Sequence, residues 1–387
     1  MQISCLQENL SRGLGAVGRI TSSRTTLPIT NHVLIGSDQS RLKLAATNLE
    51  IAISCWIGAQ IEQEGAIAVP AGLLTDFVNS LPGERIDISV ASGTRAMELK
   101  CARFEARISG QKADEFPPIP EIGEGITTRV DPHPLRAAIT QVVFAAATDD
   151  SRPVLTGGYA QFCGDKLTLA AADGFRLAVH NLPLAAPVDE EVGIIIPARS
   201  LRELDRLLKD QEDPVEFTIN PQRKQILFRL KNVEIVSQLI QGSFPKYNQL
   251  IPQSYTTRVV VNVEEFLRAI RSASVFARDG SGIVRLFMTR SAGGLPSKIT
   301  ISSRAEEVGD NVGEIEAVIE GDEAKIAFNS KYLMDVFSVI EDEQVVLEIT
   351  NPSSPGVFRP IGDGDWIQVI MPMFVQWSEG DNGEQAK

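Results

Sequence analysis

Residues 193–219 read GIIIPARSLRELDRLLKDQEDPVEFTI, and this run decides the fold. Four strand-type residues lead into a proline, leucines follow at helical spacing, and an acidic turn precedes a second strand. The same order of elements occurs in AIAVPAGLLTDFVNSLPGERIDISV (66–90) and in KIAFNSKYLMDVFSVIEDEQVVLEI (325–349). Self-similarity of this kind indicates three copies of one structural unit.

A second pattern, a strand followed by a helix, precedes each of these runs. It covers residues 2–20, 128–147 and 258–277. In the later half of each unit Pro70, Pro197 and Asn329 take the same position, where a helix begins and a fixed φ or a capping side chain is useful. Each unit is expected to hold two helices and about eight short strands. The predicted fold class is therefore α+β, with three similar domains.

Proline-rich stretches mark the boundaries between the units. DEFPPIPE ends the first unit, SFPKYNQLIP ends the second, and QVIMPMFV closes the third. Proline is unfavourable inside helices and central strands, so such stretches favour linkers. The predicted domains are 1–122, 123–252 and 253–375, followed by a polar tail over 376–387 whose composition is typical of disorder.

Composition excludes several classes of protein. The 387 residues carry 37 Lys and Arg against 50 Asp and Glu, and this formal charge of −13 argues against a domain that is basic throughout. The three histidines and four cysteines show no metal-ligand spacing, so neither a metal nor a disulfide framework is expected. The sequence has no run of about 20 apolar residues and no signal-peptide pattern, which predicts a cytoplasmic protein without a membrane span.

Motifs for catalysis are equally scarce. The sequence has no G-x-x-x-x-G-K-[ST], H-E-x-x-H or G-x-S-x-G pattern. Asp173 in ADGFR could be a reactive carboxylate, but an Asp–Gly turn explains the string as well. DGSG (279–282) and GDGDW (362–366) are interpreted as turns because they lack the further ligands of a calcium loop. We therefore expect no enzyme activity, no cofactor and no metal site.

Charge is distributed unevenly between the predicted helices and the rest of the chain. Thirteen basic and ten acidic residues lie in the six helical windows, 6–24, 71–81, 134–152, 198–210, 264–278 and 330–340. In the fourth window Arg199, Arg202, Arg206 and Lys209 follow at i, i+3, i+7 and i+10, which places them on one helical face. Such a face could contact phosphates without reading bases. A solvated face paired with acids of the same helix remains the alternative.

Several motifs resemble one known family, the β subunit of bacterial DNA polymerase III, the sliding clamp. The motifs are Ser23-Arg24, Leu27-Pro28, ADGFRLAV (172–179), FPKYNQLIP (244–252), FNSKYLMDV (328–336) and VIMPM (369–373). The resemblance is colinear over about residues 1–375. It implies a head-to-tail homodimer, a ring of six domains with helices lining a hole for duplex DNA. Such a ring tethers a polymerase for processive replication and catalyses no reaction itself.

The resemblance also implies DNA-binding residues and partners. Arg24 and Arg152 match DNA-contacting positions of the family, and Arg199 matches a basic one. With the arginines of the predicted helices, the expected DNA-binding set is Arg24, Arg152, Arg199, Arg202, Arg206, Arg268 and Arg271. The implied partners are double-stranded DNA of any sequence, the polymerase III catalytic subunit, the ATP-dependent clamp loader, and other replication and repair proteins. The resemblance also implies that the protein itself acts at the replication fork in the nucleoid.

A groove between the second and third units is implied to receive short linear peptides from these partners. The matching residues are Leu155, Ala172, Gly174, Phe175, Arg176, Leu177, Pro245, Gln249, Leu250, Asn329, Tyr332, Ser354, Pro355, Val369, Ile370, Met371, Pro372, Met373 and Phe374. Met371 and Met373 suit an adaptable apolar surface, although they could instead complete the core of the last strand. Phe175 and Gln249 replace a frequent His and a frequent basic residue, so the preferred peptide is expected to differ.

Three further residues are expected at the dimer interface, and two other functions remain open. Ile108, Val275 and Phe276 match the family's interface positions, where an apolar patch would suit a closed ring. The family usually ends shortly after its M-P-M segment, whereas this chain continues. A peptide-binding adaptor of the same fold that does not encircle DNA is one other function. An enzyme in the groove between the second and third units is another, and it depends on Asp173 and Tyr332 alone.

Overall fold

The computed structural model describes residues 1–21, 27–91, 93–220, 222, 224–277, 281–290, 296–305, 309–362 and 364–377. The chain forms two compact units. Unit 1 comprises Met1–His133, Leu184–Asp189 and Arg202–Leu239, and unit 2 comprises Pro134–Pro183, Glu190–Leu201 and Ile240–Lys387. The middle repeat of the sequence is thus shared between the two units. The domain boundaries at 122 and 252 remain a prediction.

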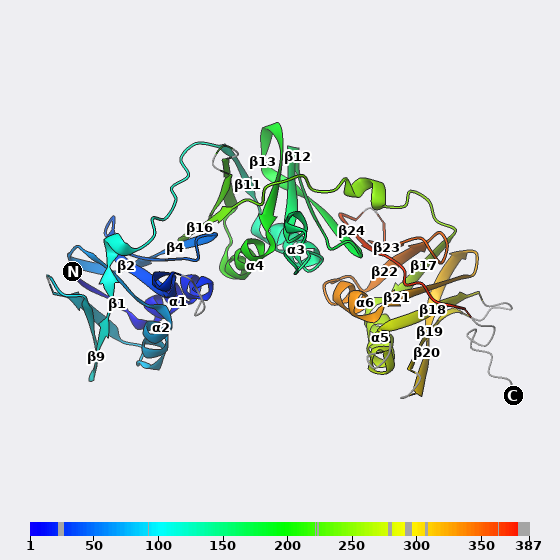
Figure 1. Ribbon diagram of the computed structural model, residues 1–387, viewed down its shortest axis with the longest axis horizontal. Coiled ribbons are helices and arrows are strands. Elements are labelled where there is room, and N and C mark those ends of the chain that lie inside the picture. Colours follow the sequence, from blue (N-terminus) through cyan, green and yellow to red (C-terminus); the bar gives the residue numbers. More distant parts are fainter. Residues whose placement is uncertain are drawn as a thin grey trace. The chain divides into compact units, whose positions relative to one another are not determined.

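Unit 1 contains two antiparallel sheets (Figure 1). Its helices are α1 (Gln7–Val17) and α2 (Ala71–Ser80). The first sheet has the order β5 (Gln60–Gln63), β1 (Gln2–Leu6), β7 (Arg85–Val90), β8 (Ala96–Cys101), β9 (Phe104–Ser109). The second sheet has the order β10 (Gln111–Lys112), β6 (Ala66–Pro70), β2 (His32–Asp38), β3 (Arg41–Thr47), β4 (Ile51–Gly58), β16 (Val233–Gln238), β15 (Gln225–Arg229), β14 (Val215–Asn220), β11 (Ile126–Val130). The β4–β16 pair makes this sheet continuous between the first and second repeats.

Unit 2 is built in the same way around the second and third repeats. Its helices are α3 (Pro132–Val143), α5 (Val263–Ala277) and α6 (Ser330–Phe337), and one of its long strands is β12 (Gly157–Ala172). One sheet has the order β13 (Arg176–Pro197), β24 (Trp366–Ile370), β23 (Gly356–Pro360), β22 (Gln344–Ile349), β17 (Thr257–Asn262), β20 (Gly309–Gly321). The other has the order β20, β19 (Ser297–Ala305), β18 (Ile283–Thr289), β21 (Ala324–Asn329). The β13–β24 pair joins the second repeat to the third.

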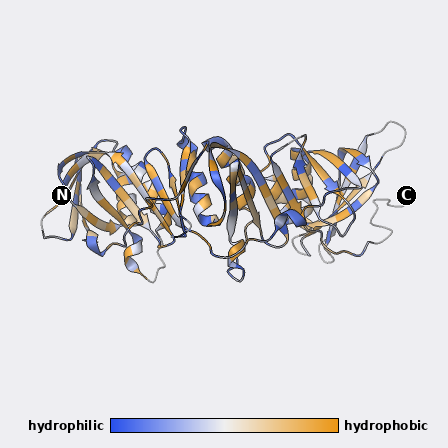
Figure 2. Cartoon of the chain, turned by 90° about the horizontal axis from the view of Figure 1, so that it is seen from above, coloured by the Kyte–Doolittle hydropathy of each residue, from blue (hydrophilic) through white to orange (hydrophobic). Residues whose placement is uncertain are grey.

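The helices cover the sheets through apolar stripes at helical spacing. On α5 the buried residues include Phe266, Ile270 and Ala273, and α6 lies beside it (Figure 1). The rings of Phe266 and Phe337 lie 4.6 Å apart between centroids, which locks α5 against α6. Along the strands hydrophobic and hydrophilic residues alternate, as Figure 2 shows. The third repeat therefore buries its core against its own pair of helices.

The α+β prediction is confirmed, with two helices in each repeat of the described residues. The expected helix entries are confirmed as well, since Pro70 is the N-cap of α2 and the Asn329 side chain accepts the Lys331 N–H at 2.9 Å. Among the described residues the strand count differs from eight in two repeats, with ten strands in 1–122 and six in 123–252. The lower number arises because β12 and β13 run on for 16 and 22 residues.

Two predicted helical windows are too long. The window 6–24 ends as an α-helix at Val17, and the window 134–152 ends at Val143. Beyond Val143 the Asp149 carboxylate accepts the backbone N–H of Ser151 at 3.0 Å, a local bond that competes with helix formation. Arg152 therefore does not lie on a helix. No helix in the described ranges is long and apolar enough to cross a membrane.

Candidate functional site

Arg176 at the start of β13 is the centre of a polar cluster in unit 2. Its side chain is only 10 % exposed. Its Nε donates to Asp173 Oδ2 at 3.0 Å, Nη1 to Asp335 Oδ2 at 2.5 Å, and Nη2 to the Phe144 carbonyl at 2.9 Å. The guanidinium also lies 4.7 Å from the Tyr332 ring centroid. One arginine therefore ties the second repeat to α6 of the third.

The ADGFR string is a turn in the structure. Asp173 Oδ1 accepts the backbone N–H groups of Phe175 and Arg176 at 2.8 and 3.0 Å, and Gly174 adopts a φ of +94°. Both carboxylate oxygens of Asp173 are thus used to form the turn and to hold Arg176. Burial raises the pKa of Tyr332, and the neighbouring Asp173 raises it further. The Tyr332 hydroxyl is therefore a weaker acid than usual, and the Asp173 carboxylate is part of the structure of the turn.

The C-terminal segment extends the same surface. β13 pairs with β24 from Arg176 opposite Ile370 to His180 opposite Trp366. Beyond β24 the Met371 N–H donates to the Phe175 carbonyl at 2.8 Å, and the Met373 N–H donates to the Ala327 carbonyl at 2.7 Å. The ring of Phe175 stacks on that of Tyr332 at 6.4 Å between centroids. The predicted residues at 174–177, 332 and 369–374 are thereby brought together.

Burial separates the predicted peptide-binding residues into a floor and a rim. The buried residues are Leu155, Ala172, Leu177, Val369 and Ile370. The half-buried ones are Arg176, Asn329, Tyr332, Ser354, Pro355, Pro372 and Met373, and the exposed ones are Gly174, Phe175, Pro245, Gln249, Leu250, Met371 and Phe374. Phe374 is 91 % exposed and Phe175 is 57 % exposed, so the rim presents large apolar side chains to solvent.

Tyr247 explains how the segment 245–250 reaches this surface. It is buried in one apolar cluster with Ala172, Leu177 and Val369, and its ring lies 6.3 Å from that of Phe244. Sequence reasoning missed Tyr247, Phe144 and Asp335. Asp335 is the one acid of its helical window, and that isolated charge is the only sequence signal that could have identified it.

Arg152 lies beside the turn and not on a helix that could line a hole. Its Nη2 donates to the Asp173 carbonyl at 2.8 Å and lies 3.8 Å from the Asp149 carboxylate. A Cβ on Gly174 would come within 2.6 Å of Arg152 Nη1. The structure thus places this predicted DNA-binding residue at the edge of the apolar surface in unit 2.

The arginines of α4 (Ala198–Leu207) are not equivalent. Arg199 and Arg202 are exposed. Arg206 is 20 % exposed, and its Nε donates to Glu203 at 2.8 Å. Its Nη1 and Nη2 donate to the carbonyls of Gly15 and Ala16 at 3.1 and 2.7 Å, in the last turn of α1. A cation at this place satisfies carbonyls that have no partner within the helix. Arg206 therefore joins the first two repeats and has few donors left for a phosphate.

A basic cavity of about 640 Å³ lies next to Arg206 in unit 1. Its lining includes Arg12, Arg19, Arg41 and Lys231 but only one acid, Asp210. Arg12 pairs with Glu8 at 3.0 Å on the exposed face of α1, and Arg41 Nη1 donates to Asn232 at 3.3 Å. Sequence reasoning missed Arg41 and Lys231 because it counted charge on helices, whereas these two lie on a strand and in a strand turn.

The other predicted DNA-binding residues lie on α5 or outside the described residues. Arg268 pairs with Glu264 at 2.7 Å, with both side chains largely exposed, and Arg271 is exposed one turn further on. Arg24 lies outside the residues that the structure describes. Among the described residues no cluster of three or more metal-ligating side chains is found.

The predicted dimer positions lie next to two strand edges. Ile108 is buried on β9, the last strand of its sheet, while Phe104 on the same strand is 52 % exposed. Val275 on α5 is 60 % exposed, and Phe276 is half-buried. Close to α5, the Gly309–Ala317 part of β20 pairs with β19 on one side.

Comparison with protein families fits this architecture. Three family models match in order: the N-terminal domain of the DNA polymerase III beta subunit at residues 1–120, the central domain at 129–246, and the C-terminal domain at 248–374. The chain belongs to the DNA polymerase III beta subunit family. The resemblance seen in the sequence is thereby confirmed over nearly the whole chain.

Individual members of the family are similar over their full length. The beta sliding clamp of Bacillus subtilis is 32 % identical over 382 residues, covering 96 % of this chain and 99 % of the relative. That of Synechocystis is 32 % identical over 396 residues, with the same coverage. The crystal structure of the Bacillus subtilis DNA polymerase sliding clamp superposes with a TM-score of 0.91 at 32 % identity, covering 97 % of this chain and 100 % of that one. The Pseudomonas aeruginosa DNA polymerase III subunit beta gives 0.88 at 26 %, also over 97 % and 100 %.

Proposed function

We propose that this chain is a sliding clamp: a head-to-tail homodimer that encircles duplex DNA and tethers the replicative polymerase. The observation that carries the proposal is the colinear match of all three repeats to beta-subunit domains, with the two repeat junctions built as continuous sheets. Its partners are double-stranded DNA, the polymerase III catalytic subunit, the clamp loader and other peptide-bearing replication and repair proteins. It acts at the replication fork in the nucleoid and catalyses no reaction.

Two unlike strand edges support head-to-tail assembly. The β8–β9 hairpin carries Lys100, Arg103 and Arg107 against Glu98 and Glu105, a net charge of +1, whereas the exposed face of β20 carries Asp310, Glu314 and Glu316. Edge strands with free backbone groups pair readily with another chain, and opposite charges favour unlike edges over like ones. Phe104 and Val275 would then be buried between protomers together with the predicted Ile108 and Phe276.

DNA contacts are assigned to a set that differs from the one the sequence suggested. Arg24, Arg199, Arg202, Arg268 and Arg271 remain the proposed phosphate contacts, and three of the cations that line the basic cavity, Arg12, Arg41 and Lys231, join them. Arg206 is proposed to act inside the protein, because protein acceptors take three of its donors, and Arg152 is proposed to act at the turn, where it donates to the Asp173 carbonyl. Contacts of this type position the ring without reading the sequence, which suits sliding.

Partner peptides are assigned to the floor and rim in unit 2. Short peptides bind with apolar anchors in a hydrophobic surface, and the exposed Phe175, Leu250, Met371 and Phe374 provide such a surface. Methionines accommodate several ligands because their side chains are flexible and polarizable. The large ring of Phe175 makes this rim more apolar than a histidine would.

Retention on circular DNA tests the proposal. The clamp, loaded by its clamp loader, is expected to stay on nicked circular DNA and to leave the same DNA after linearisation, because the link is topological. Equal retention on both forms would refute the ring.

The variant Arg24→Gln/Arg199→Gln/Arg202→Gln is expected to load poorly onto DNA. Unchanged loading would point to an adaptor that does not encircle DNA. Sedimentation should give the mass of a dimer.

A further inference from the structure

Trp377 is packed against the outer face of a sheet in unit 2. Its ring meets that of Phe287 on β18 edge to face, with 5.2 Å between centroids and an angle of 81°. The Nζ of Lys325 on β21 lies 5.2 Å from the Trp377 ring centroid. Edge-to-face packing and a cation over an indole are both favourable arrangements, so three side chains hold the end of the described chain in place.

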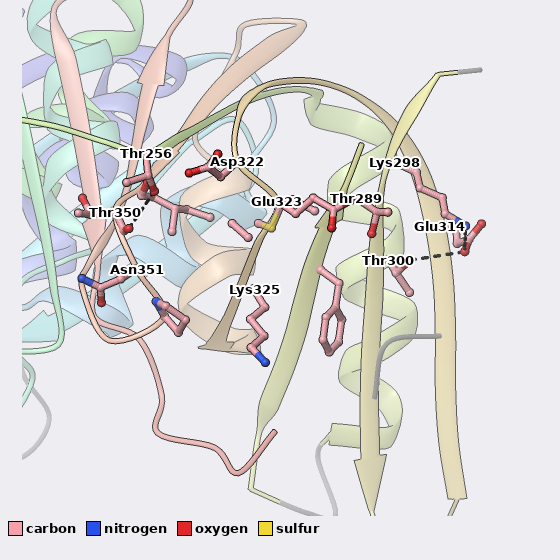
Figure 3. Close-up of a pocket in the computed structure, with 15 residues that line it drawn as sticks. Thr256, Thr289, Lys298, Thr300, Glu314, Asp322, Glu323, Lys325, Thr350 and Asn351 are labelled. Atoms are coloured by element: carbon pink, nitrogen blue, oxygen red, sulfur yellow. Dashed lines mark hydrogen bonds and ion pairs between the residues drawn. The ribbon is translucent and has the colours of Figure 1, made fainter. Parts of the chain in front are cut away.

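The face that receives Trp377 is hollowed. Phe287 and Lys325 both line a cavity of about 750 Å³ on the sheet of β18 to β21. Figure 3 shows Lys325 and Thr289 on this surface, with Lys298 and Glu314 paired beside them at 2.7 Å. The neighbours of Phe287 on its strand, Leu286 and Met288, belong to the core below, so Phe287 points to the opposite face. On that largely polar face it offers an apolar contact, and Trp377 covers it.

The segment between β24 and Trp377 is fixed at successive points. The Met371 N–H donates to the Phe175 carbonyl, and the Met373 N–H donates to the Ala327 carbonyl. Trp377 supplies the third point, four residues further on. Phe374 lies between the second and third points and is 91 % exposed. The apolar rim is thus held from both ends, and Trp377 is the downstream anchor.

We propose that the outer face of β18 and β21 is a docking site for this chain's own C-terminal segment, and that Trp377 positions Met371–Phe374 to receive partner peptides. The inference rests on the proposed function, since it concerns the same peptide-binding surface. Holding a rim in its binding conformation reduces the entropy lost when a ligand binds. Trp377 is a positioning residue that does not itself contact the peptide.

Binding of the polymerase III catalytic subunit tests the positioning. Trp377→Ala removes an aromatic pair and a cation–π contact, together worth about tenfold in an equilibrium constant, so the dissociation constant should rise by up to about tenfold. Trp377→Phe keeps a ring over Phe287 and should restore most of the affinity. Dimer mass should not change in either variant, and protein that is already loaded on nicked circular DNA should be retained equally. Equal affinity of Trp377→Ala and the unchanged protein would overturn the proposal.

A second measurement separates this inference from the proposed function. The chain has three tryptophans, so Trp56→Phe/Trp366→Phe leaves Trp377 as the single reporter of fluorescence. Acrylamide should quench it less than free tryptophan, and adding Lys325→Ala should increase the quenching. Quenching equal to that of free tryptophan would refute the docking. If the polymerase subunit fails to bind the unchanged protein while Trp377 stays protected, the proposed function fails and the docking stands.

Discussion

The two repeat junctions use the same construction for different surfaces. In unit 1 the β4–β16 pair continues a sheet across the junction, and Arg206 of the second repeat donates to the end of α1. In unit 2 the β13–β24 pair does the same, and Arg176, also of the second repeat, donates to Asp335 on α6. Each junction therefore combines backbone pairing with one largely buried arginine.

The surroundings of the two arginines differ sharply. Arg206 borders a cavity in which four further cations face one acid. Arg176 lies under Tyr332 and Phe144 and next to the exposed Phe175 and Met371. The junction itself is therefore a structural device, and the two junctions differ in the chemical character of their borders. A basic border suits phosphates, and an apolar, aromatic border suits peptides.

The largest effect is expected at Arg176. Arg176→Met leaves Asp173 and Asp335 without their cation, and breaking a largely buried pair costs about 3 kcal/mol. Denaturant unfolding of unit 2 should show this loss, and affinity for the polymerase subunit should fall with it. Arg268→Met is the matched control, because its exposed pair with Glu264 contributes less than about 1 kcal/mol. Equal effects of the two variants would contradict the role given to Arg176.

A smaller and more selective effect is expected at the other junction. Arg206→Met should destabilise unit 1 by about 2 kcal/mol through the lost carbonyl bonds, with little change in the salt dependence of duplex binding.

The variant Arg12→Gln/Arg41→Gln/Lys231→Gln should instead change the salt dependence of duplex binding and not the stability. It should leave stability nearly unchanged and reduce the slope of log affinity against log salt by roughly 0.9 per lost phosphate contact. Anisotropy of a labelled duplex over a salt series measures the slope, and an unchanged slope would remove the cavity from the DNA-binding surface.

The smallest effect is a pH dependence confined to the junction in unit 2. His180 Nδ1 lies 2.9 Å from Gln141 Oε1, and the Gln368 side chain donates to the Gln141 carbonyl at 2.7 Å. Burial lowers the pKa of His180 below its ordinary value of 6.5, and Asp365 opposes this shift more weakly. As pH falls below 6.5, the unfolded chain takes up a proton that the folded chain does not, so stability decreases.

The comparison that measures this effect is between the unchanged protein and His180→Gln. On going from neutral to mildly acidic pH, the free energy of unfolding of the unchanged protein should fall faster than that of the variant, by at most about 1.4 kcal/mol per pH unit. The melting temperature, measured over the same pH range, should follow this difference. Above about pH 7.5 His180 is neutral in both states, and its titration should then contribute nothing. Parallel pH profiles over the acidic range would show that another group is responsible.

The sequence by itself determined the repeat, the fold class, the helix entries and the family. These depend on local chemistry, such as leucine spacing in 201–208 or the proline and asparagine at the helix starts, and that chemistry is visible in a string of residues. The sequence also identified most of the rim, because Met371, Met373 and Phe175 occur in recognisable motifs. It left the role of each cation open, since charge on one helical face does not reveal what lies opposite that face.

Tertiary structure decided what each arginine contacts. Arg206 and Arg202 are the same residue type on the same helix, but of the two only Arg206 donates to the carbonyl end of α1. Arg152 donates to the Asp173 carbonyl because α3 ends at Val143. Arg41 and Lys231 lie 190 residues apart and share one cavity only because β4 pairs with β16. The ring of Trp377 likewise contacts that of Phe287, which lies far from it in the sequence. These contacts join residues that lie apart in the sequence, and no local pattern along the chain encodes them.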